Sequence, residues 1–391
     1  MSRASGARLS VGVVVPGWSE PGGPPALPAL QDHLGRLAGL HDVRVVTLRH
    51  PPDRRSYVDD AGVPVTTMGA GRQGGATGRA SVLGRGVRGL WALHRERPFD
   101  LLHGFWADEP GAVAVLSGRV LGVPAVVSLM GGELAAIEDI GYGAALGRGG
   151  RWTAKVALRG ASIVTTGSAT LFRSAASVAP GVPLRMVPLG VDLATFHPGP
   201  DPRQSSDGPR LLWAGSLTAV KDPVLLLRAF ARLPDRRSTL DVAGDGPLRP
   251  GLERLAFTLG VANRVRFLGA LDRAGLAAGY RAADALVVTS RHEAQSMVVA
   301  EGAACGLPVV GTAVGVVPEL ADASGGVVVT GRSPAELAGA IASVMEPGVR
   351  ERMGAAAAVF AARRWDLERS VTRWSGLWVE VASAGVRRTG G

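Results

Sequence analysis

Acidic side chains in residues 289–319 are spaced in a way that suits a polar ligand. The residue pattern predicts a strand that ends at Ser290, a short loop that carries Glu293, and a helix that begins near Ser296. Glu301 lies on that helix, where its side chain can turn back toward the loop. Two carboxylates that flank one point in this way can accept hydrogen bonds from the hydroxyls of a sugar.

The start of the same helix is a predicted anion site. The first backbone N–H groups, from about Ser296, Met297 and Val298, have no partner inside the helix, and the helix dipole adds partial positive charge there. A phosphate at the helix start and a sugar between the carboxylates would together form one ligand. The alternative is a solvated glutamate in a loop and another on an exposed helix face, without any ligand.

The elements that must position these groups alternate between strands and helices. Short apolar runs separated by longer Ala/Leu/Arg segments of helical period predict parallel sheets covered on both faces. Such α/β sheets bind ligands at the carboxyl ends of their strands. The predicted strands are residues 11–15, 43–48, 63–68, 100–105, 124–129, 161–167, 185–190, 210–215, 239–244, 264–269, 285–290, 308–312 and 325–329.

The Pro- and Gly-rich segment HPGPDPRQSSDGPR has no periodicity and separates the two strand series, which predicts two domains joined by a linker. The residues after Trp365 return to an amphipathic helical pattern that carries Trp374 and Trp378. The expected parts are an N-terminal domain, a linker, a C-terminal domain and a C-terminal helix that returns to the first domain. Their expected bounds are 1–193, 194–209, 210–363 and 364–391.

The composition limits the partners of the chain. It has 391 residues, a formal net charge of +10 and one cysteine, Cys305, so an internal disulfide is excluded. The basic excess is spread over both halves without interleaved aromatics, which argues against nucleic acid and leaves contact with an anionic membrane or a phosphorylated acceptor. No apolar run is long enough to cross a bilayer, so we expect a cytoplasmic protein, with peripheral contact at the inner face of the cell membrane left open.

Five segments of the second half occur in the order and spacing of one family. They are GSLTAVKD (215–222), AGDGP (243–247), RFLG (266–269), the loop and helix from Glu293, and GLPVVGTAVGVVPE (306–319). This half resembles the C-terminal domain of the retaining glycosyltransferase family 4. In the first half HDVRVVTL, DLLHGF, GVPAVVSLMGGE and VPLGVDLATF (187–196) also follow the family order.

The resemblance implies the GT-B fold, with two Rossmann-like doubly wound parallel-sheet domains facing a central cleft. It also implies transfer of a hexose-like unit from a nucleotide-diphosphate sugar to the hydroxyl of a glycan, lipid or small-molecule alcohol. The configuration at the anomeric carbon would be retained. No cofactor is implied beyond the donor substrate, and the oligomeric state stays open.

The resemblance also assigns roles to residues. Lys221, the only lysine in the second half, would bind the donor pyrophosphate with the backbone near Gly215 and Ser216. A cation about 4 Å from the leaving diphosphate contributes a few kcal/mol at intermediate dielectric. The other implied donor contacts are Gly244, Asp245 and Gly246 lining the cleft, Leu268 at the base, Glu293 at the sugar or phosphate and Glu301 at the ribose. Because the sequence contains no Asp-x-Asp motif and no metal-ligand spacing of His, Asp and Glu, we expect chemistry without a metal.

Two residues depart from the family pattern. Ser216 stands where the family commonly has an arginine, and Met130 stands where many members have a histidine at the catalytic site. His103, at the end of the strand DLLHGF, is the candidate for the missing catalytic role, and a satisfied core histidine is the alternative. The predicted acceptor-side residues are Gly22, Gly23, His103, Met130, Gly131 and Gly132.

Other functions stay open beside this one. A degenerate member that binds a nucleotide sugar or a partner without turnover is the main alternative, and a basic peripheral-membrane scaffold is another. GAGRQG (69–74) matches a dinucleotide motif but lacks an acidic residue at the end of a following strand, so residues 69–79 are interpreted as a mobile loop. In residues 78–98 Leu83, Val87, Leu90 and Trp91 lie on one helical face, which predicts either a core stripe or a membrane-surface helix.

Overall fold

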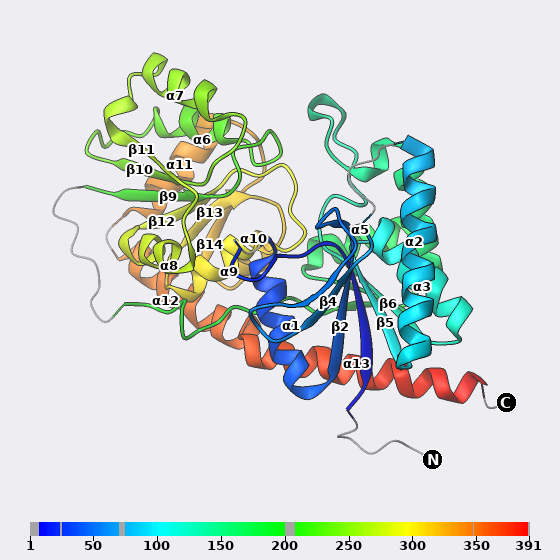
Figure 1. Ribbon diagram of the computed structural model, residues 1–391. Coiled ribbons are helices and arrows are strands. Elements are labelled where there is room, and N and C mark those ends of the chain that lie inside the picture. Colours follow the sequence, from blue (N-terminus) through cyan, green and yellow to red (C-terminus); the bar gives the residue numbers. More distant parts are fainter. Residues whose placement is uncertain (1–7, 24–25, 70–74, 200–207, 347, 390–391) are drawn as a thin grey trace. The chain divides into compact units, whose positions relative to one another are not determined.

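Apolar runs form the strands because strands covered by helices on both faces must be apolar on both sides. In β1 (Ser10–Gly17) the residues from Val11 to Val15 are all buried. The computed structural model describes residues 8–23, 26–69, 75–199, 208–346 and 348–389. The chain separates into two compact units, of which unit 1 comprises residues 1–189 and 368–391, and unit 2 comprises residues 190–367 (Figure 1).

Unit 1 contains an eight-stranded sheet in the order β3-β4-β2-β1-β5-β6-β7-β8, in which only the β3–β4 pairing is antiparallel. Its strands are β1 (Ser10–Gly17), β2 (Asp42–His50), β3 (Ser56–Val58), β4 (Pro64–Thr67), β5 (Leu101–Phe105), β6 (Ala125–Leu129), β7 (Ile163–Thr166) and β8 (Leu184–Met186). Its helices are α1 (Pro28–Leu40), α2 (Gly75–Glu96), α3 (Glu109–Leu121), η1 (Glu138–Ile140), η2 (Ala144–Leu146), α4 (Arg148–Gly160), α5 (Ala169–Val178) and α13 (Leu367–Thr389), of which α13 begins one residue before the unit boundary.

Unit 2 contains a six-stranded parallel sheet in the order β11-β10-β9-β12-β13-β14. Its strands are β9 (Arg210–Ala214), β10 (Thr239–Ala243), β11 (Val265–Gly269), β12 (Ala285–Val288), β13 (Val309–Thr312) and β14 (Gly326–Val329). Its helices are α6 (Pro223–Phe230), α7 (Arg249–Thr258), η3 (Ala262–Arg264), α8 (Arg273–Ala282), α9 (Met297–Ala304), α10 (Val317–Asp322), α11 (Pro334–Val344) and α12 (Val349–Arg364).

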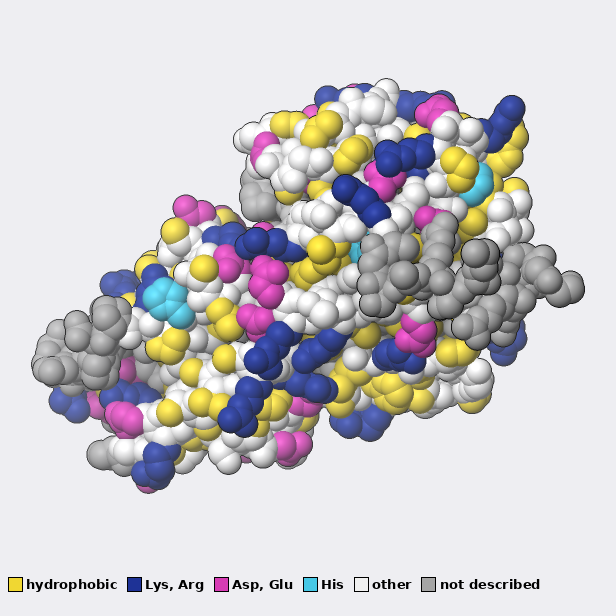
Figure 2. Space-filling view, turned by 90° about the horizontal axis from the view of Figure 1, so that it is seen from below, with side chains coloured by type: hydrophobic (Ala, Val, Ile, Leu, Met, Phe, Trp, Pro, Cys, Tyr) yellow, Lys and Arg dark blue, Asp and Glu magenta, His cyan; other side chains and the backbone are white. Residues whose placement is uncertain are grey.

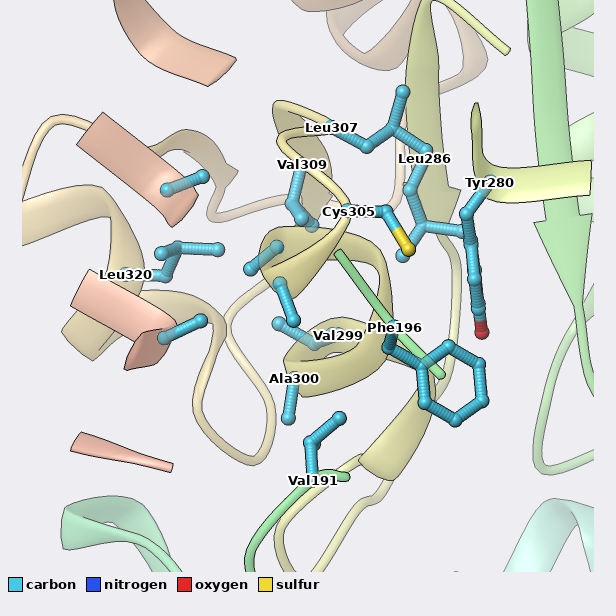
Figure 3. Packing of buried hydrophobic residues seen from close by; sticks show 14 of the residues in the cluster. Val191, Phe196, Tyr280, Leu286, Val299, Ala300, Cys305, Leu307, Val309 and Leu320 are labelled. Atoms are coloured by element: carbon cyan, nitrogen blue, oxygen red, sulfur yellow. The ribbon is translucent and has the colours of Figure 1, made fainter. Parts of the chain in front are cut away.

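Helix α9 is held in place by the apolar core on one face of the unit 2 sheet. Val299, Ala300 and Ala303 of this helix are fully buried against residues of β12, β13, α8, α10 and α12 (Figure 3). Helices α6, α7 and α11 cover the opposite face with a second core. Burial of apolar area stabilises the folded state by about 25 cal/mol per Å². A shift of α9 would expose these residues to water, so their packing fixes the direction in which the start of α9 points.

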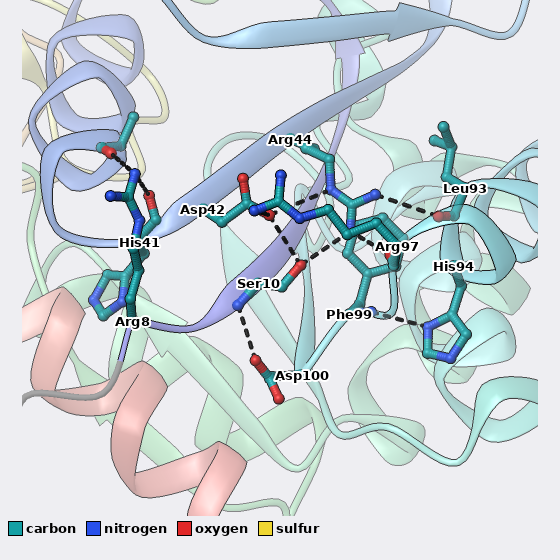
Figure 4. A network of polar contacts seen from close by, with 11 residues as sticks. Arg8, Ser10, His41, Asp42, Arg44, Leu93, His94, Arg97, Phe99 and Asp100 are labelled. Atoms are coloured by element: carbon teal, nitrogen blue, oxygen red, sulfur yellow. Dashed lines mark hydrogen bonds and ion pairs between the residues drawn. The ribbon is translucent and has the colours of Figure 1, made fainter. Parts of the chain in front are cut away.

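A polar network ties together the amino ends of three strands in unit 1. The backbone N–H of Ser10 donates to Asp100 at 2.9 Å, and the hydroxyl of Ser10 contacts Asp42 at 3.2 Å (Figure 4). The guanidinium of Arg44 donates to the Ser10 hydroxyl and lies 3.9 Å from the centre of the Phe99 ring. These contacts align β1, β2 and β5, whose carboxyl ends lie at the other edge of the sheet.

The α/β fold with two doubly wound parallel sheets is confirmed, and every predicted strand is present. β3 (Ser56–Val58), a short edge strand without a buried apolar run, was not predicted. The predicted loop at residues 69–79 is wrong in part, because α2 already begins at Gly75; residues 70–74 lie outside the described residues.

Two further details differ from the predicted packing. Trp91 was predicted on a helical face that is either a core stripe or a membrane surface; it is 45 % exposed and stacks with the guanidinium of Arg95, so it is not part of a core stripe. Phe196 falls inside the predicted linker 194–209, yet it is buried against the ring of Tyr280 in the core of unit 2 (Figure 3). Residues 200–207 of that linker lie outside the described residues.

Candidate functional site

An ion pair at the carboxyl edge of the unit 2 sheet forms the centre of the candidate site. The Lys221 Nζ atom lies 2.5 Å from Oε1 of Glu293, and the Ser290 hydroxyl donates to the same oxygen at 2.7 Å. The Glu293 side chain is only 10 % exposed and that of Lys221 24 %. Burial strengthens such a charge-assisted contact, so the geometry of the two side chains is well defined.

The loops that carry this pair are fixed to each other. The Thr289 hydroxyl donates to the backbone oxygen of Lys221 at 2.8 Å and accepts from the indole N–H of Trp213 at 3.0 Å. The backbone N–H of Arg291 donates to Val220 at 2.7 Å. These hydrogen bonds therefore hold the loop after β9 against the loop after β12, although Lys221 and Glu293 are far apart in the sequence.

Glycines allow the turns after β9 and β10 to pass each other closely. A Cβ atom added at Gly244, where φ is +142°, would lie 1.8 Å from the backbone oxygen of Gly215. The backbone N–H of Leu217 donates to the backbone oxygen of Asp245 at 2.9 Å, which is a second contact between the two turns. The predicted residues Gly215, Gly244, Asp245 and Gly246 thus lie together, while Ser216 is an exposed side chain beside Thr218.

Helix α9 begins at the position that the sequence analysis predicted. Its N-cap residue Ser296 has φ +74°, a left-handed conformation that is uncommon outside glycine, and its buried hydroxyl has no hydrogen-bond partner. The first-turn N–H groups of Met297 and Val298 precede the first helical hydrogen bonds, as at any helix start. The N–H of Val316 donates to Gln295 at 2.9 Å, so the loop after β13 supports this helix start.

Two other predicted donor residues lie on neighbouring elements. Glu301 accepts a hydrogen bond from the Tyr280 hydroxyl at 3.1 Å, and burial with Glu301 nearby raises the pKa of Tyr280 well above its usual value. Leu268 lies near the end of β11 and is 39 % exposed. The donor-binding roles of Glu301 and Leu268, like those of Lys221 and Glu293, stay predictions.

In unit 1 a buried carboxylate shapes the loop after β6. Glu133 accepts hydrogen bonds from the backbone N–H groups of Met130 at 2.8 Å, Gly131 at 2.7 Å and Ala107 at 3.3 Å. Burial raises the pKa of Glu133, and the three amides oppose this shift. The turn is tight, since a Cβ atom at Gly132 would lie 2.8 Å from the Tyr142 ring.

The other predicted acceptor-side residues lie in the same unit. The backbone N–H of Gly22 donates to the carboxylate of Asp60 at 3.1 and 3.2 Å. The backbone N–H of Gly23 donates to the backbone oxygen of Glu20 at 3.0 Å. Backbone contacts therefore shape this turn after β1.

His103, the predicted candidate for the missing catalytic role, lies in the interior of unit 1. Its side chain is fully buried, between the Ser128 hydroxyl at 2.7 Å and the indole N–H of Trp378 at 3.1 Å. Burial lowers the pKa of His103 to about 3. The structure therefore corrects the prediction in favour of the alternative, a satisfied core histidine.

Several residues that shape these sites were not predicted from the sequence. Ser290, Thr289 and Gly315 support the pair in unit 2. In unit 1 the carboxyl groups that were missed are the buried Glu133 and the partly buried Asp108. The acidic residue after the two glycines in SLMGGE was the one available signal, because a carboxylate beside a glycine turn can accept from the backbone N–H groups of the turn.

No three His, Cys, Asp or Glu side chains in the described parts of the chain come together as a metal site. Within the same residues, no helix has the length and apolar character needed to cross a membrane.

Comparison with protein families agrees with the architecture. Residues 28–190 match the family model described as "Glycosyl transferase 4-like domain", and residues 208–347 match "Glycosyl transferases group 1". A D-inositol 3-phosphate glycosyltransferase of Frankia alni is 38 % identical over 296 residues, which cover 68 % of this chain and 70 % of the relative. A protein of the same name from Thermomonospora curvata is 36 % identical over 318 residues, covering 72 % of each.

Solved structures share the fold over almost the entire chain. The sucrose-phosphate synthase of Thermosynechococcus elongatus superposes with a TM-score of 0.82 at 21 % identity, covering 96 % of this chain and all of that one. Anabaena HepE in complex with UDP-glucose gives a TM-score of 0.72 at 19 % identity, covering 94 % of this chain and 98 % of that one. The chain belongs to the group 1, family 4-like glycosyltransferases of the GT-B fold.

Proposed function

We propose that this chain transfers a sugar from a nucleotide-diphosphate sugar to an acceptor hydroxyl, with retention at the anomeric carbon and without a metal ion. The observation that carries the proposal is the Lys221–Glu293 ion pair, at 2.5 Å, on the same sheet edge as the start of α9. In the absence of donor the two side chains neutralise each other. With donor bound, Lys221 would turn to the diphosphate and Glu293 to a sugar hydroxyl.

The proposed chemistry uses positive charge from the protein. The bond between the anomeric carbon and the phosphate oxygen breaks, and negative charge develops on the leaving diphosphate. Lys221 and the first N–H groups of α9 would stabilise that charge. The acceptor oxygen forms the new bond on the same face of the sugar, and its proton passes to a phosphate oxygen. This path needs no histidine, which suits Met130 and the buried His103.

The names of the relatives suggest the first substrates to try. UDP-glucose is the ligand of one structural relative, and D-inositol 3-phosphate is the acceptor in the name of the Frankia relative. We propose a uridine-diphosphate sugar as donor and a cyclic polyol phosphate as acceptor.

A panel of nucleotides tests the donor class. We expect UDP to raise the melting temperature of the protein, because a ligand that binds only the folded state stabilises it by mass action. At 100 times Kd the gain is about 2.7 kcal/mol. Differential scanning fluorimetry with UDP, GDP, ADP and CMP measures it, and CMP, which lacks the diphosphate, is the control. Equal melting temperatures with all four nucleotides would remove the donor site as proposed.

A non-catalytic nucleotide-sugar binder is the second candidate, and Met130 is the observation that favours it. Such a protein would still be stabilised by UDP but would leave the donor intact. Release of UDP from UDP-glucose, followed with and without D-inositol 3-phosphate, distinguishes the two candidates. Turnover that depends on the acceptor supports the enzyme.

We also propose that helix α4 (Arg148–Gly160) contacts an anionic membrane surface. On the face drawn in Figure 2 basic and acidic side chains lie side by side. In α4, however, every charged side chain is basic and exposed, and Trp152, also exposed, lies among them. Exposed cations around a half-exposed tryptophan are typical of helices that lie on anionic lipid. The charged residues are Arg148, Arg151, Lys155 and Arg159.

Vesicle binding tests the role of α4. We expect the protein to co-sediment with vesicles of phosphatidylglycerol at low salt and to dissociate at 0.5 M salt, where surface charges are screened. The double variant Lys155→Glu, Arg159→Glu should lose this binding, whereas Arg95→Glu on α2 should keep it. Equal binding of native and double variant would exclude α4 as the contact.

A further inference from the structure

A cavity in unit 1 is bordered by a carboxyl group that the proposed reaction does not yet use. The cavity has a volume of about 220 Å³ and lies beside Trp106, Asp108, Gly132, Glu133 and Tyr142. The loops after β5 and β6, both at the carboxyl edge of the sheet, contribute the first four of these residues. In parallel α/β sheets this edge is where ligands bind.

The local sequence explains why Asp108 is left without a partner. Asp108 is the N-cap residue of α3, and an aspartate at this position usually accepts from the N–H of the second or third helical residue. Here the second residue is Pro110, which has no N–H, and the N–H of Gly111 donates instead to Trp106 at 2.9 Å. The Asp108 side chain therefore makes no capping hydrogen bond.

The unused oxygen is buried. Oδ1 of Asp108 is shielded from solvent and has no hydrogen-bond partner, although the residue borders the cavity. Burial of a polar group without a partner destabilises the fold. Two residues earlier, Trp106 is held at φ +75°, which is rare for a bulky side chain. The strained backbone of Trp106 and the uncapped Asp108 both lie in the loop that borders the cavity, and strain of this kind is concentrated at functional sites.

The charges around the cavity define what the ligand can be. Glu133 and Glu109 lie near Asp108, and each of them raises its pKa electrostatically. Arg79 acts in the opposite direction, but its guanidinium lies 3.9 Å from Glu109, which also binds Arg49 at 2.7 Å. An anionic group would be repelled here. A neutral group with hydroxyls fits, because hydroxyls can donate to carboxylate oxygens.

We propose that this cavity binds the hydroxyl-bearing ring of a cyclic polyol acceptor, with Asp108 accepting a hydrogen bond from a ring hydroxyl. This assignment rests on the proposed function and names a residue for its acceptor side. The phosphate of the proposed acceptor lies outside this subsite. Trp106 and Tyr142 supply aromatic walls, a common arrangement in small-molecule sites.

The protonation of Asp108 gives the proposal a second signature. Burial and the neighbouring glutamates raise the pKa of Asp108 to about 7. Only the ionised carboxylate makes the stronger, charge-assisted bond to a hydroxyl. Acceptor affinity should therefore increase as the pH rises from 6 to 8.

Calorimetry with D-inositol 3-phosphate and with unphosphorylated myo-inositol tests the proposal on the full chain. We expect Asp108→Asn to weaken binding of both by about tenfold or more and to abolish the pH dependence between 6 and 8. UDP binding should not change, because the donor residues lie in unit 2. Inorganic phosphate should not compete for binding of myo-inositol. Asp100→Asn, just before the other end of β5, is the matched control for loss of one carboxylate and should bind like the native protein.

The same variant separates binding from a purely structural role. If Asp108 only strains the fold, Asp108→Asn at pH 8 would raise the melting temperature and leave polyol affinity within twofold of the native value. That result would overturn the proposal, as would a native protein that binds UDP but neither polyol. Failure of the donor site itself would appear separately, as loss of UDP binding in the native protein.

Discussion

Replacement of Lys221 by alanine is expected to lower kcat/KM for sugar transfer by about 10²- to 10³-fold, the usual effect of removing one group that stabilises developing negative charge. The Nζ atom of Lys221 lies 2.5 Å from Glu293 and on the edge of the sheet where the diphosphate is proposed to bind. Without it, the leaving diphosphate would keep the helix-start amides and the backbone near Gly215 and Ser216. The loss should appear mainly in kcat, since the charge develops in the transition state.

Matched variants sharpen this test. Lys155→Ala removes the other lysine of the chain, on the exposed face of α4, and should leave transfer in solution unchanged. Lys221→Arg keeps the charge and should retain part of the rate. Glu293→Gln keeps the size of the side chain and should mainly raise KM for the donor. Steady-state kinetics with UDP-glucose measure all four, and a Lys221→Ala enzyme within twofold of the native rate would contradict the role.

Acid is expected to destabilise unit 1 through His103. The folded pKa of this histidine is about 3, whereas an unfolded histidine titrates near 6.5. Between these values the unfolded chain binds a proton that the folded chain does not, so stability is complete above 6.5 and declines as the pH falls. At pH 5 the loss attributable to His103 is about 2 kcal/mol.

The hydrogen bonds around His103 explain the direction of this effect. The indole N–H of Trp378 donates to Nδ1, so Nε2 carries the proton and donates to Ser128, whose hydroxyl contacts Thr165 at 2.7 Å. A second proton on Nδ1 would face the Trp378 N–H. In His103→Gln, urea unfolding should lose about 2 kcal/mol less than in the native protein between pH 7 and pH 5.

In the comparison of His103→Gln with the native chain, the contributions of other buried groups to the pH dependence of stability cancel. Asp108 and Glu133 have raised pKa values and act in the opposite direction, yet they are present in both proteins. Nitrogen NMR offers an independent measurement, because Nδ1 of His103 should remain unprotonated at pH 5. An equal pH dependence in both proteins would show that His103 is not neutral in the folded state.

The strands and the helix start could be predicted because they depend on local patterns. Continuous apolar runs marked every strand except β3, and the sequence before Met297 placed the start of α9 correctly. Lys221 and Glu293 were both singled out from the sequence, but their contact joins residues that are 72 positions apart. The contact between the two side chains is set by the packing of the sheet and its loops, which local sequence patterns do not reveal.

His103 shows where sequence reasoning failed. The end of its strand was located correctly, but alternate residues of a strand point to opposite faces, and no local signal selects the face. Its partner Trp378 lies 275 positions away, on α13. Asp108 was missed for another reason, because its missing cap depends on both Pro110 and the Trp106 carbonyl.

Helix α13 has a consequence for the order in which the chain can fold. Trp374 and Trp378 of this helix pack around His103, and Ser370 binds His33, so part of the interior of unit 1 is supplied by a segment that leaves the ribosome after unit 2. All of unit 2 is synthesised earlier, as one continuous stretch. During translation unit 2 can therefore complete its core while unit 1, although begun first, still exposes the apolar surface that these tryptophans cover.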